Sequence, residues 1–246
     1  MTMPTPILLM TRPRNASDRF LSVLPNDVSA RITICHAPLI RIQPLGGDID
    51  LAGVAGVIFS SANGVAAAAA QSERRDLPAY CVGGATTKAA QQAGWSARML
   101  GATADALVAA LSQAAVPGPL LHLTGVHTRG NVAQRLTNAG LSTRRQPVYD
   151  QQLLPFSEPV KALVGGSQPV IAPIFSPRTA RHFVGQCPKI AHLYLIAISP
   201  AAAKPLSNMP CSALNVAVRP DAAAMAAQVE NMVNHLCRVE SSRGAQ

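Results

Sequence analysis

The stretch VIFSSANGVA at residues 57–66 returns as PIFSPRTARH at residues 173–182. In both copies a short apolar run ends in phenylalanine and serine, and a segment without strand character follows. YCVGGATTKAA at 80–90 likewise returns as LIAISPAAAKPL at 195–206, at the same spacing along the chain. Several segments that share one spacing predict an internal duplication, so the chain is expected to contain the same structural unit twice.

Hydroxyl side chains are expected at the starts of the helices in both copies. The repeat aligns Ser60 with Ser176, and each is predicted to be an N-cap, because a hydroxyl there accepts a bond from a free first-turn N–H. Pro177 follows at the first helical position, where proline is favoured. Thr86 or Thr87 is predicted to cap the helix within the GGATTKAAQQ segment.

The remaining pattern predicts an α/β fold. The strand-like segments are short apolar runs without polar alternation, which is typical of parallel strands buried on both faces. They alternate with helices of about ten residues, as in βα units that build open parallel sheets. A length of 246 residues suits two such lobes. The segments HAPLIRIQPL and RRQPVYDQQLLPF are candidate connections between them, and a chain that crosses twice is left open.

The charge balance points to an anionic partner. The formal net charge is +9, although charged residues make up only 13% of the chain. Nucleic acid, an anionic membrane surface and a small polyanion are the three possibilities. The only adjacent basic pairs are Arg74-Arg75 and Arg144-Arg145, and aromatics are 4%, whereas nucleic-acid binders cluster charge and add stacking rings. A small polyanionic substrate is therefore preferred over nucleic acid or membrane.

Several classes of protein lack support in the sequence. No apolar run approaches the roughly 18 residues of a membrane helix, and the N-terminal segment has no signal-peptide features. Five scattered cysteines without a C-x-x-C pair predict neither disulfides nor zinc and fit a reducing cytoplasm. Phosphate-loop, dinucleotide, nucleophile-elbow and zinc-protease motifs are missing. His36 and His122 lie in apolar strands and are expected to be core residues.

Six polar turns are candidates for ligand binding. In open parallel sheets ligands lie beyond the carboxyl ends of the strands. Each turn leads from a predicted strand into a helix and offers unpaired N–H groups at a positive helix end. The turns are TRPRN, FSSANG, VGGATT, LTGVHTRG, FSPRT and AISPAA. Turns that line one cleft could hold a large polycarboxylate. Ser60, Ser61 and Asn63 are interpreted as a capped helix start that also faces the ligand, with capping alone as the alternative.

Tyr149 is the candidate for chemistry. It lies in a predicted connecting strand beside Arg144, Arg145 and Asp150. A neutral phenol can donate a hydrogen bond, and in a cleft it could help a hydroxyl group to leave. The alternative is a packed aromatic ring whose hydroxyl is satisfied within the fold.

Taken in order, these motifs resemble the uroporphyrinogen-III synthase family over residues 7–235. The resemblance rests on TRP after the first strand, IFSSANGV, CVGGATTKAAQQAG, LTGVHTRGNVAQRL, PVYD, IFSPRTA and LIAISPAAAKPL. It implies two similar doubly wound parallel-sheet α/β domains, a two-stranded connection and an active site in the cleft between them. The implied division is one domain of 1–36 with 152–246, another of 42–145, and connecting strands at 37–41 and 146–151.

The resemblance also implies an activity and its partners. Hydroxymethylbilane, a polycarboxylate, would be cyclised to uroporphyrinogen III with loss of water and inversion of the D ring, without metal or cofactor. The substrate could be handed over by hydroxymethylbilane synthase, and a cytoplasmic monomer is expected. The alternatives are a two-lobed binding protein for a small anion, without catalysis, and a regulatory nucleic-acid binder.

Site residues follow by position in the motifs. Tyr149 matches the family tyrosine proposed to assist loss of the hydroxyl. The expected substrate-binding residues are Thr11, Arg12, Pro13, Ser60, Ser61, Asn63, Thr86, Gly125, Arg129, Ser176, Pro177 and Ser199. The turn ISPAA at 198–202 departs from the family pattern, because its usual glycine and threonine are missing.

Overall fold

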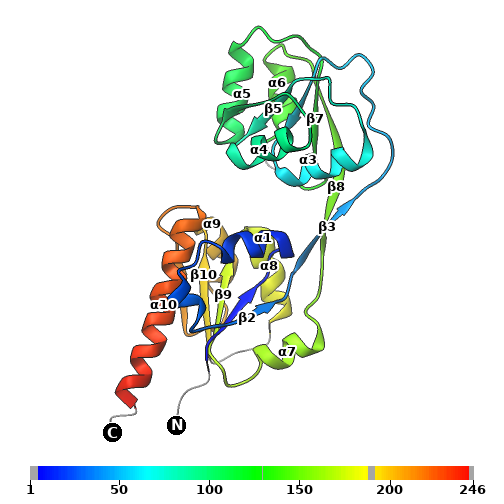
Figure 1. Cartoon of the computed structure of the whole chain (residues 1–246). Helices are drawn as coiled ribbons and strands as arrows, with labels where there is room; N and C mark the ends of the chain where they lie inside the picture. Colours follow the sequence, from blue (N-terminus) through cyan, green and yellow to red (C-terminus); the bar gives the residue numbers. More distant parts are fainter. Residues whose placement is uncertain (1–4, 129, 188–191, 244–246) are drawn as a thin grey trace. The chain divides into compact units, whose positions relative to one another are not determined.

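The computed structural model describes residues 5–128, 130–187 and 192–243. The chain divides into two compact units, and each contains one sheet (Figure 1). The first unit combines Met1–Arg41 with Leu153–Gln246, and the second is Ile42–Gln152.

The elements of the first unit are β1 (Ile7–Met10), α1 (Arg14–Leu21), α2 (Asn26–Ser29), β2 (Thr33–His36), α7 (Glu158–Val164), β9 (Val170–Ile174), α8 (Pro177–Gln186), β10 (Leu193–Ala197), α9 (Pro200–Ala203), η1 (Lys204–Leu206), β11 (Ala213–Val216) and α10 (Ala222–Arg243). Those of the second unit are β4 (Gly56–Phe59), α3 (Ala62–Gln71), β5 (Ala79–Val82), α4 (Gly84–Gln92), β6 (Ala97–Gly101), α5 (Ala104–Gln113), β7 (Leu120–Gly125), α6 (Val132–Asn138) and β8 (Thr143–Leu153). β3 (Ile40–Pro44) spans the boundary in sequence and belongs to the second sheet.

The two sheets share one strand order. The first runs β11-β10-β9-β1-β2 and the second runs β3-β8-β7-β4-β5-β6. The strands β1 and β2 correspond to β7 and β8, and the strands β9, β10 and β11 correspond to β4, β5 and β6. With this correspondence the two orders are identical, except that the second sheet has β3 as an additional edge strand. Apart from the edge pair of β3 and β8, neighbouring strands run parallel within both sheets. The predicted α/β fold with two similar parallel sheets is therefore confirmed.

Each sheet is buried on both faces, as the uninterrupted apolar runs predict. In β1, Ile7 and Leu9 pack into one core cluster while Leu8 and Met10 pack into another on the opposite face. All four side chains are at most 1% exposed. Side chains of successive strand residues point to opposite faces, so this alternation requires helices on both sides of the sheet.

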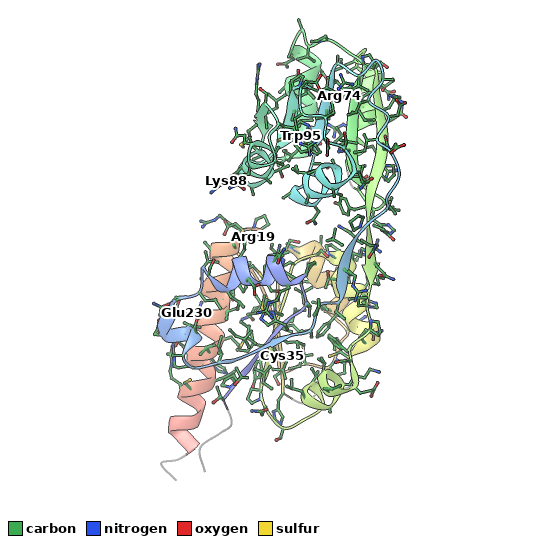
Figure 2. The ribbon with its side chains drawn as sticks, turned by 45° about the vertical axis from the view of Figure 1, so that its right-hand side comes forward. Arg19, Cys35, Arg74, Lys88, Trp95 and Glu230 are labelled. Carbon is green, nitrogen blue, oxygen red and sulfur yellow. The ribbon has the colours of Figure 1, made fainter. Side chains whose placement is uncertain are left out.

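The second unit repeats this arrangement with few aromatic rings. Val57 and Phe59 of β4 pack on one face, and Ile58 packs on the other. Trp95 contacts Phe59 edge-on, with ring centroids 5.0 Å apart, and the Arg75 guanidinium lies 4.0 Å above the indole. Figure 2 shows Trp95 inside this unit. In the described part of the chain no helix is long and apolar enough to cross a bilayer.

The predicted cap at Ser60 is wrong by one residue. Ser61 is the N-cap of α3, and its Oγ accepts a bond from the Gly64 N–H at 3.2 Å. Strand β4 ends at Phe59, and Ser60 lies between the strand and the cap, just as Phe175 lies between β9 and Ser176. The repeat alignment pairs Phe59 with Phe175, but β4 includes its phenylalanine and β9 ends one residue before its own, so the cap follows one residue later in the first copy. The other copy is as predicted: Ser176 caps α8, and Pro177 is the first residue of that helix.

The predicted cap at Thr86 or Thr87 is also wrong. α4 begins at Gly84, and Gly83 is its N-cap, with no side-chain cap bond. Gly83 has φ 75, a conformation that favours glycine, so the chain turns directly after β5 and the helix starts earlier than expected. The Thr87 hydroxyl instead donates to the Gly83 carbonyl within the first turn, at 3.0 Å.

Candidate functional site

The polar turns lie where the sequence predicts, between a strand and the next helix. All six follow a parallel strand, so within each unit they gather at the carboxyl-end edge of its sheet. In the second unit they follow β4, β5 and β7, and in the first unit they follow β1, β9 and β10. The candidate residues of each unit are described in turn.

Tyr149 and Ser61 meet in the second unit. Tyr149 lies on β8, is 4% exposed, and places its Oη 3.1 Å from the Ser61 Oγ. Gly125, the last residue of β7, is its partner in the strand register. A Cβ at Gly125 would lie 2.7 Å from the Tyr149 Cζ, so only glycine admits the ring in this position. The Ser61 hydroxyl, which caps α3, and the Tyr149 phenol therefore form one polar pair beside Gly125.

Ser60, the neighbour of the cap, bonds to a different strand. Its Oγ lies 2.9 Å from the Nε2 of His122 on β7. His122 is 2% exposed, and burial lowers its pKa to about 4, with the positive charge of Arg145 acting in the same direction. The imidazole is thus neutral near pH 7. The Ser60-Ser61 turn is anchored twice, through His122 and through Tyr149.

Arg145 holds the turn that follows β7. Its Nη2 donates to the carbonyls of Gly125 at 2.9 Å and Val126 at 2.6 Å. The Val126 N–H in turn donates to the Tyr149 carbonyl at 2.9 Å. These bonds fix the backbone against which the phenol packs.

Three further residues were expected to bind substrate in this unit, and none of them is seen to join the Tyr149–Ser61 pair. Asn63 lies exposed in the first turn of α3. Thr86 is 6% exposed inside the first turn of α4. The expected Arg129 lies outside the described residues.

In the first unit, Thr11, Arg12 and Pro13 link β1 to α1. Thr11 is 1% exposed, and its Oγ1 has no hydrogen-bond partner within the described residues. The Arg12 guanidinium lies 4.3 Å above the Phe175 ring. Burial lowers the pKa of Arg12, and the like charge of Arg19 adds to this. Pro13 is the N-cap position of α1 and provides no side-chain bond.

The two serine turns of the first unit cap helices. Ser176 Oγ accepts from the Thr179 N–H at 3.0 Å and lies 2.8 Å from the Thr179 Oγ1. Ser199 Oγ accepts from the Ala202 N–H at 3.3 Å at the start of α9, a helix of 4 residues. The divergent ISPAA turn therefore keeps a capped helix start, with Ser199 as the hydroxyl-bearing residue.

The chemistry available at these turns is that of hydroxyl groups, backbone and side-chain amides, guanidinium groups and the imidazole of His127. Among the described residues no group of three His, Cys, Asp or Glu side chains could hold a metal ion. The described turns thus offer hydrogen-bond donors, together with one buried phenol that can serve as donor or acceptor.

Sequence reasoning missed the part that His122 plays. It was interpreted as a core histidine, which its burial confirms, but its contact with Ser60 was not predicted. The available signal is the alternation in LLHLTG, which places His122 on one face of β7 with the polar Thr124. The sequence does not show that β7 lies beside β4.

The duplicated parallel sheets and their capped polar turns define a two-unit α/β protein. Residues 29–227 match the family described as uroporphyrinogen-III synthase HemD, and the chain belongs to that family. This confirms the resemblance drawn from the motifs.

Two solved structures show the same fold. One is the uroporphyrinogen-III synthetase of Helicobacter pylori, with 15% identity, a TM-score of 0.69, and coverage of 94% of this chain and 100% of the other. A mutant uroporphyrinogen III synthase of Thermus thermophilus has 11% identity, a TM-score of 0.55, and coverage of 94% and 99%. A search of curated protein sequences found no match.

Proposed function

We propose that the protein is a hydro-lyase that cyclises hydroxymethylbilane to uroporphyrinogen III in tetrapyrrole biosynthesis. The observation that carries the proposal is the Tyr149–Ser61 pair beside Gly125, in a chain that belongs to the synthase family. The pair combines a buried phenol with a hydroxyl at a helix start, at the sheet edge where α/β proteins bind ligands.

Tyr149 acts on the hydroxyl that leaves. The phenol donates its proton to that oxygen while the carbon–oxygen bond breaks, so the hydroxyl departs as water, and the proton released when the D ring closes restores the phenol. Ser61, at 3.1 Å, orients the phenol. The remaining azafulvene-like cation is attacked by the substituted carbon of the D ring, which gives a spiro intermediate. The older bond from that carbon to the bridge of the neighbouring pyrrole then breaks and re-forms at the free α-carbon of the D ring, which loses its proton, and the ring is thereby inverted.

Positioning is the main contribution of the protein in this proposal. The substrate loses its hydroxyl readily and closes without guidance to the uninverted isomer. Holding the chain folded so that the substituted carbon reaches the cation selects the inverted product. Turns of both units would share this task, with amides and Arg12 binding carboxylates, in keeping with the net charge of +9.

We also propose the setting in which the protein works. It acts as a cytoplasmic monomer, without metal or cofactor, on substrate that hydroxymethylbilane synthase could hand over directly. It uses neither nucleic acid nor membrane as a partner.

The isomer composition of the product tests the proposal. Hydroxymethylbilane is incubated with the full chain, and the products are oxidised and separated by chromatography. Uroporphyrinogen III is expected to dominate, and to form faster than the spontaneous isomer. A binding protein without catalysis would leave only uroporphyrinogen I, which would refute the proposed activity.

A further inference from the structure

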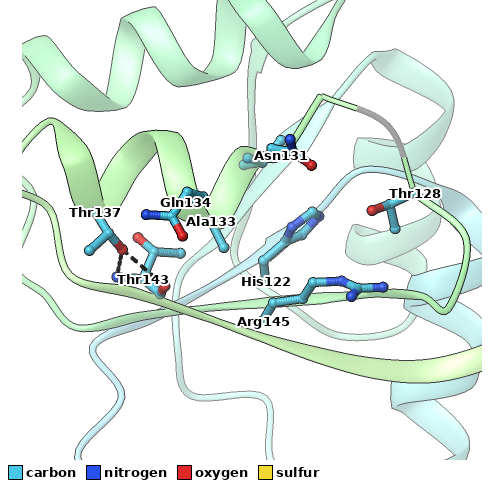
Figure 3. A pocket seen from close by; sticks show the side chains of 9 residues that line it. His122, Thr128, Asn131, Ala133, Gln134, Thr137, Thr143 and Arg145 are labelled. Atoms are coloured by element: carbon cyan, nitrogen blue, oxygen red, sulfur yellow. Dashed lines mark hydrogen bonds between the residues drawn. The ribbon is translucent and has the colours of Figure 1, made fainter.

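The second unit contains a pocket on the face of β7 that carries α6. Its volume is about 270 Å³, and β7, α6, β8 and the segment leading into α6 line it (Figure 3). His122 forms its buried floor, while Arg145, Thr128 and Asn131 surround one end.

The charge at this end of the pocket is positive. Among the described residues that line the pocket, Arg145 is the only charged one, and none of them is a carboxylate. Its Nη2 is engaged by the carbonyls of Gly125 and Val126. The described residues offer no partner to its Nε and Nη1. A guanidinium held at one nitrogen, with N–H groups to spare, is prepared to bind an oxyanion.

His122 has an unused nitrogen here. Its Nε2 is committed to Ser60 at 2.9 Å, whereas Nδ1 has no partner among the described residues. The side chain lines the pocket although it is 2% exposed. Nδ1 is the second nitrogen of the ring, and in the matching tautomer it can donate to a ligand or water in the pocket.

Asn131 contributes a free amide. It is the N-cap residue of α6, with φ 43 and ψ 42, and its side chain makes no cap bond. An asparagine at this position ordinarily bonds to a first-turn N–H. Here it adopts a left-handed conformation, which asparagine tolerates better than most other residues, and its side chain is left unbonded among the described residues. Its amide lines the pocket.

The other end of the pocket has its polar groups satisfied. The Thr137 hydroxyl donates to the Thr143 carbonyl at 3.2 Å and accepts from the Thr143 N–H at 3.1 Å. Gln134 donates to Asn138 at 2.8 Å. Unused donors therefore gather at one end, around Arg145, Asn131 and His122.

We propose that this pocket binds an oxyanion, a carboxylate or phosphate group, through Arg145, the Asn131 amide and an Nδ1–H of His122. The group could come from a carboxylate arm of the tetrapyrrole, a source that rests on the proposed function. It could equally belong to a free small anion.

Binding would act on the neighbouring Ser60-Ser61 turn. A neutral imidazole that donates from Nδ1 must accept at Nε2, so the Ser60 hydroxyl becomes the donor in their bond. The anion thus selects one tautomer of His122 and one direction for the bond to Ser60. Ser60 is adjacent to the residue that pairs with Tyr149, so the pocket reaches the proposed catalytic group through two bonded contacts.

Titration of the ¹⁵N-labelled full chain with inorganic phosphate, and separately with propionate, tests the site. The imidazole signals of His122, assigned by their loss in His122→Gln, are followed by NMR. Saturable shifts and the Nδ1–H tautomer at saturation are expected. Absence of a saturable shift, or an Nε2–H tautomer at saturation, would overturn the proposal.

Matched variants locate the binding. Arg145→Gln is expected to weaken it about tenfold or more, because it removes a charge-assisted bond. Asn131→Gly keeps the left-handed backbone but removes the amide, and is expected to weaken binding several-fold. Arg144→Gln is the control, since Arg144 lies on the same strand and pairs with Asp50 outside the pocket, at 3.0 Å. Equal losses in Arg144→Gln and Arg145→Gln would also refute the site.

Kinetics distinguish the two sources. If a substrate arm occupies the pocket, propionate competes with hydroxymethylbilane, and Arg145→Gln raises KM while Arg144→Gln does not. If a free anion is the ligand, the NMR binding persists without competition. Should the wild-type chain form no uroporphyrinogen III, the proposed function fails, while the anion titration still decides the pocket.

Discussion

Removing the Tyr149 hydroxyl deletes one hydrogen bond and leaves the packing of the ring unchanged. Tyr149→Phe is expected to lower kcat by about 10²-fold, the low end for a general acid, because the hydroxyl of the substrate is already a good leaving group. The product should remain uroporphyrinogen III, since positioning is retained. Stopped assays with isomer separation measure both. Tyr194→Phe, a half-buried tyrosine of β10, is the control. Full rate in Tyr149→Phe would remove Tyr149 from the mechanism.

Gly125 is required by the ring that it faces. Gly125→Ala would place a methyl group 2.7 Å from the Tyr149 Cζ, and overpacking of this kind costs about 1–3 kcal/mol. We expect urea denaturation to show this loss, and kcat to fall because the phenol is displaced. Gly185→Ala in α8 meets nothing within 4 Å and should instead stabilise the protein by about 0.4–1 kcal/mol. Unchanged stability of Gly125→Ala would show that the ring can move freely.

His122 makes stability depend on pH. Its folded-state pKa of about 4 lies below the ordinary value of 6.5, so between these values the unfolded chain binds more protons. Stability should therefore be complete above pH 6.5 and fall as the pH drops toward 4, by about 3 kcal/mol for this residue. Urea melts give the free energy of unfolding of the wild type and of His122→Gln at each pH. The difference between the two separates the contribution of His122 from that of the carboxylates, which both proteins share. A constant difference across that range would contradict a buried neutral imidazole.

The contacts of individual residues were the part of the structure that the sequence predicted least well. Tyr149 could be singled out from its residue type and neighbours, but its contacts could not. Its partner Ser61 lies in another part of the chain, and they meet only because β7, between β4 and β8, ends in a glycine. The bond between Ser60 and His122 depends in the same way on strand order. Local patterns contain no information on such long-range pairs.

Among the elements, the starts of α3 and α8 are built alike. Ser61 has φ −158 and ψ 152, Ser176 has φ −159 and ψ 151, and each hydroxyl accepts a first-turn N–H. Ser61→Ala and Ser176→Ala should each cost about 1 kcal/mol, and the glycine variants only a few tenths. Ser60→Ala removes no cap bond. Thermal or urea melts provide the values. A larger loss from glycine than from alanine would show that capping is not the main role of these serines.

Elements were easier to predict than their exact starts. Apolar runs bounded by polar turns identified the strands and the helices that follow them. The start of α3 was wrong by one residue, and that of α4 was misplaced because Gly83 adopts φ 75 directly after β5. Several hydroxyls compete for each cap position. Which of them caps depends on where the strand leaves the sheet, and its neighbours in the sheet set that point.

At the scale of the whole molecule, repetition explains the shared strand order. A short motif that recurs at constant spacing predicts matching elements, and both sheets have the same order around β1 and β7. The outer strand β3 has no counterpart in the first sheet, and the repeat gave no sign of it. The division of the chain into domains and the placing of the site in a cleft between them stay predictions.

The second unit should fold by itself. It is continuous in sequence, and its two core clusters are built entirely from residues between 42 and 152. A fragment of residues 40–153, which keeps β3 and β8 whole, is expected to show native-like circular dichroism and one cooperative urea transition. It should not convert hydroxymethylbilane to uroporphyrinogen III, because the proposed binding of substrate needs the turns that follow β1, β9 and β10 as well. A folded fragment that makes the inverted isomer would place the whole activity in the second unit, and an unfolded fragment would show that its two cores need the first unit.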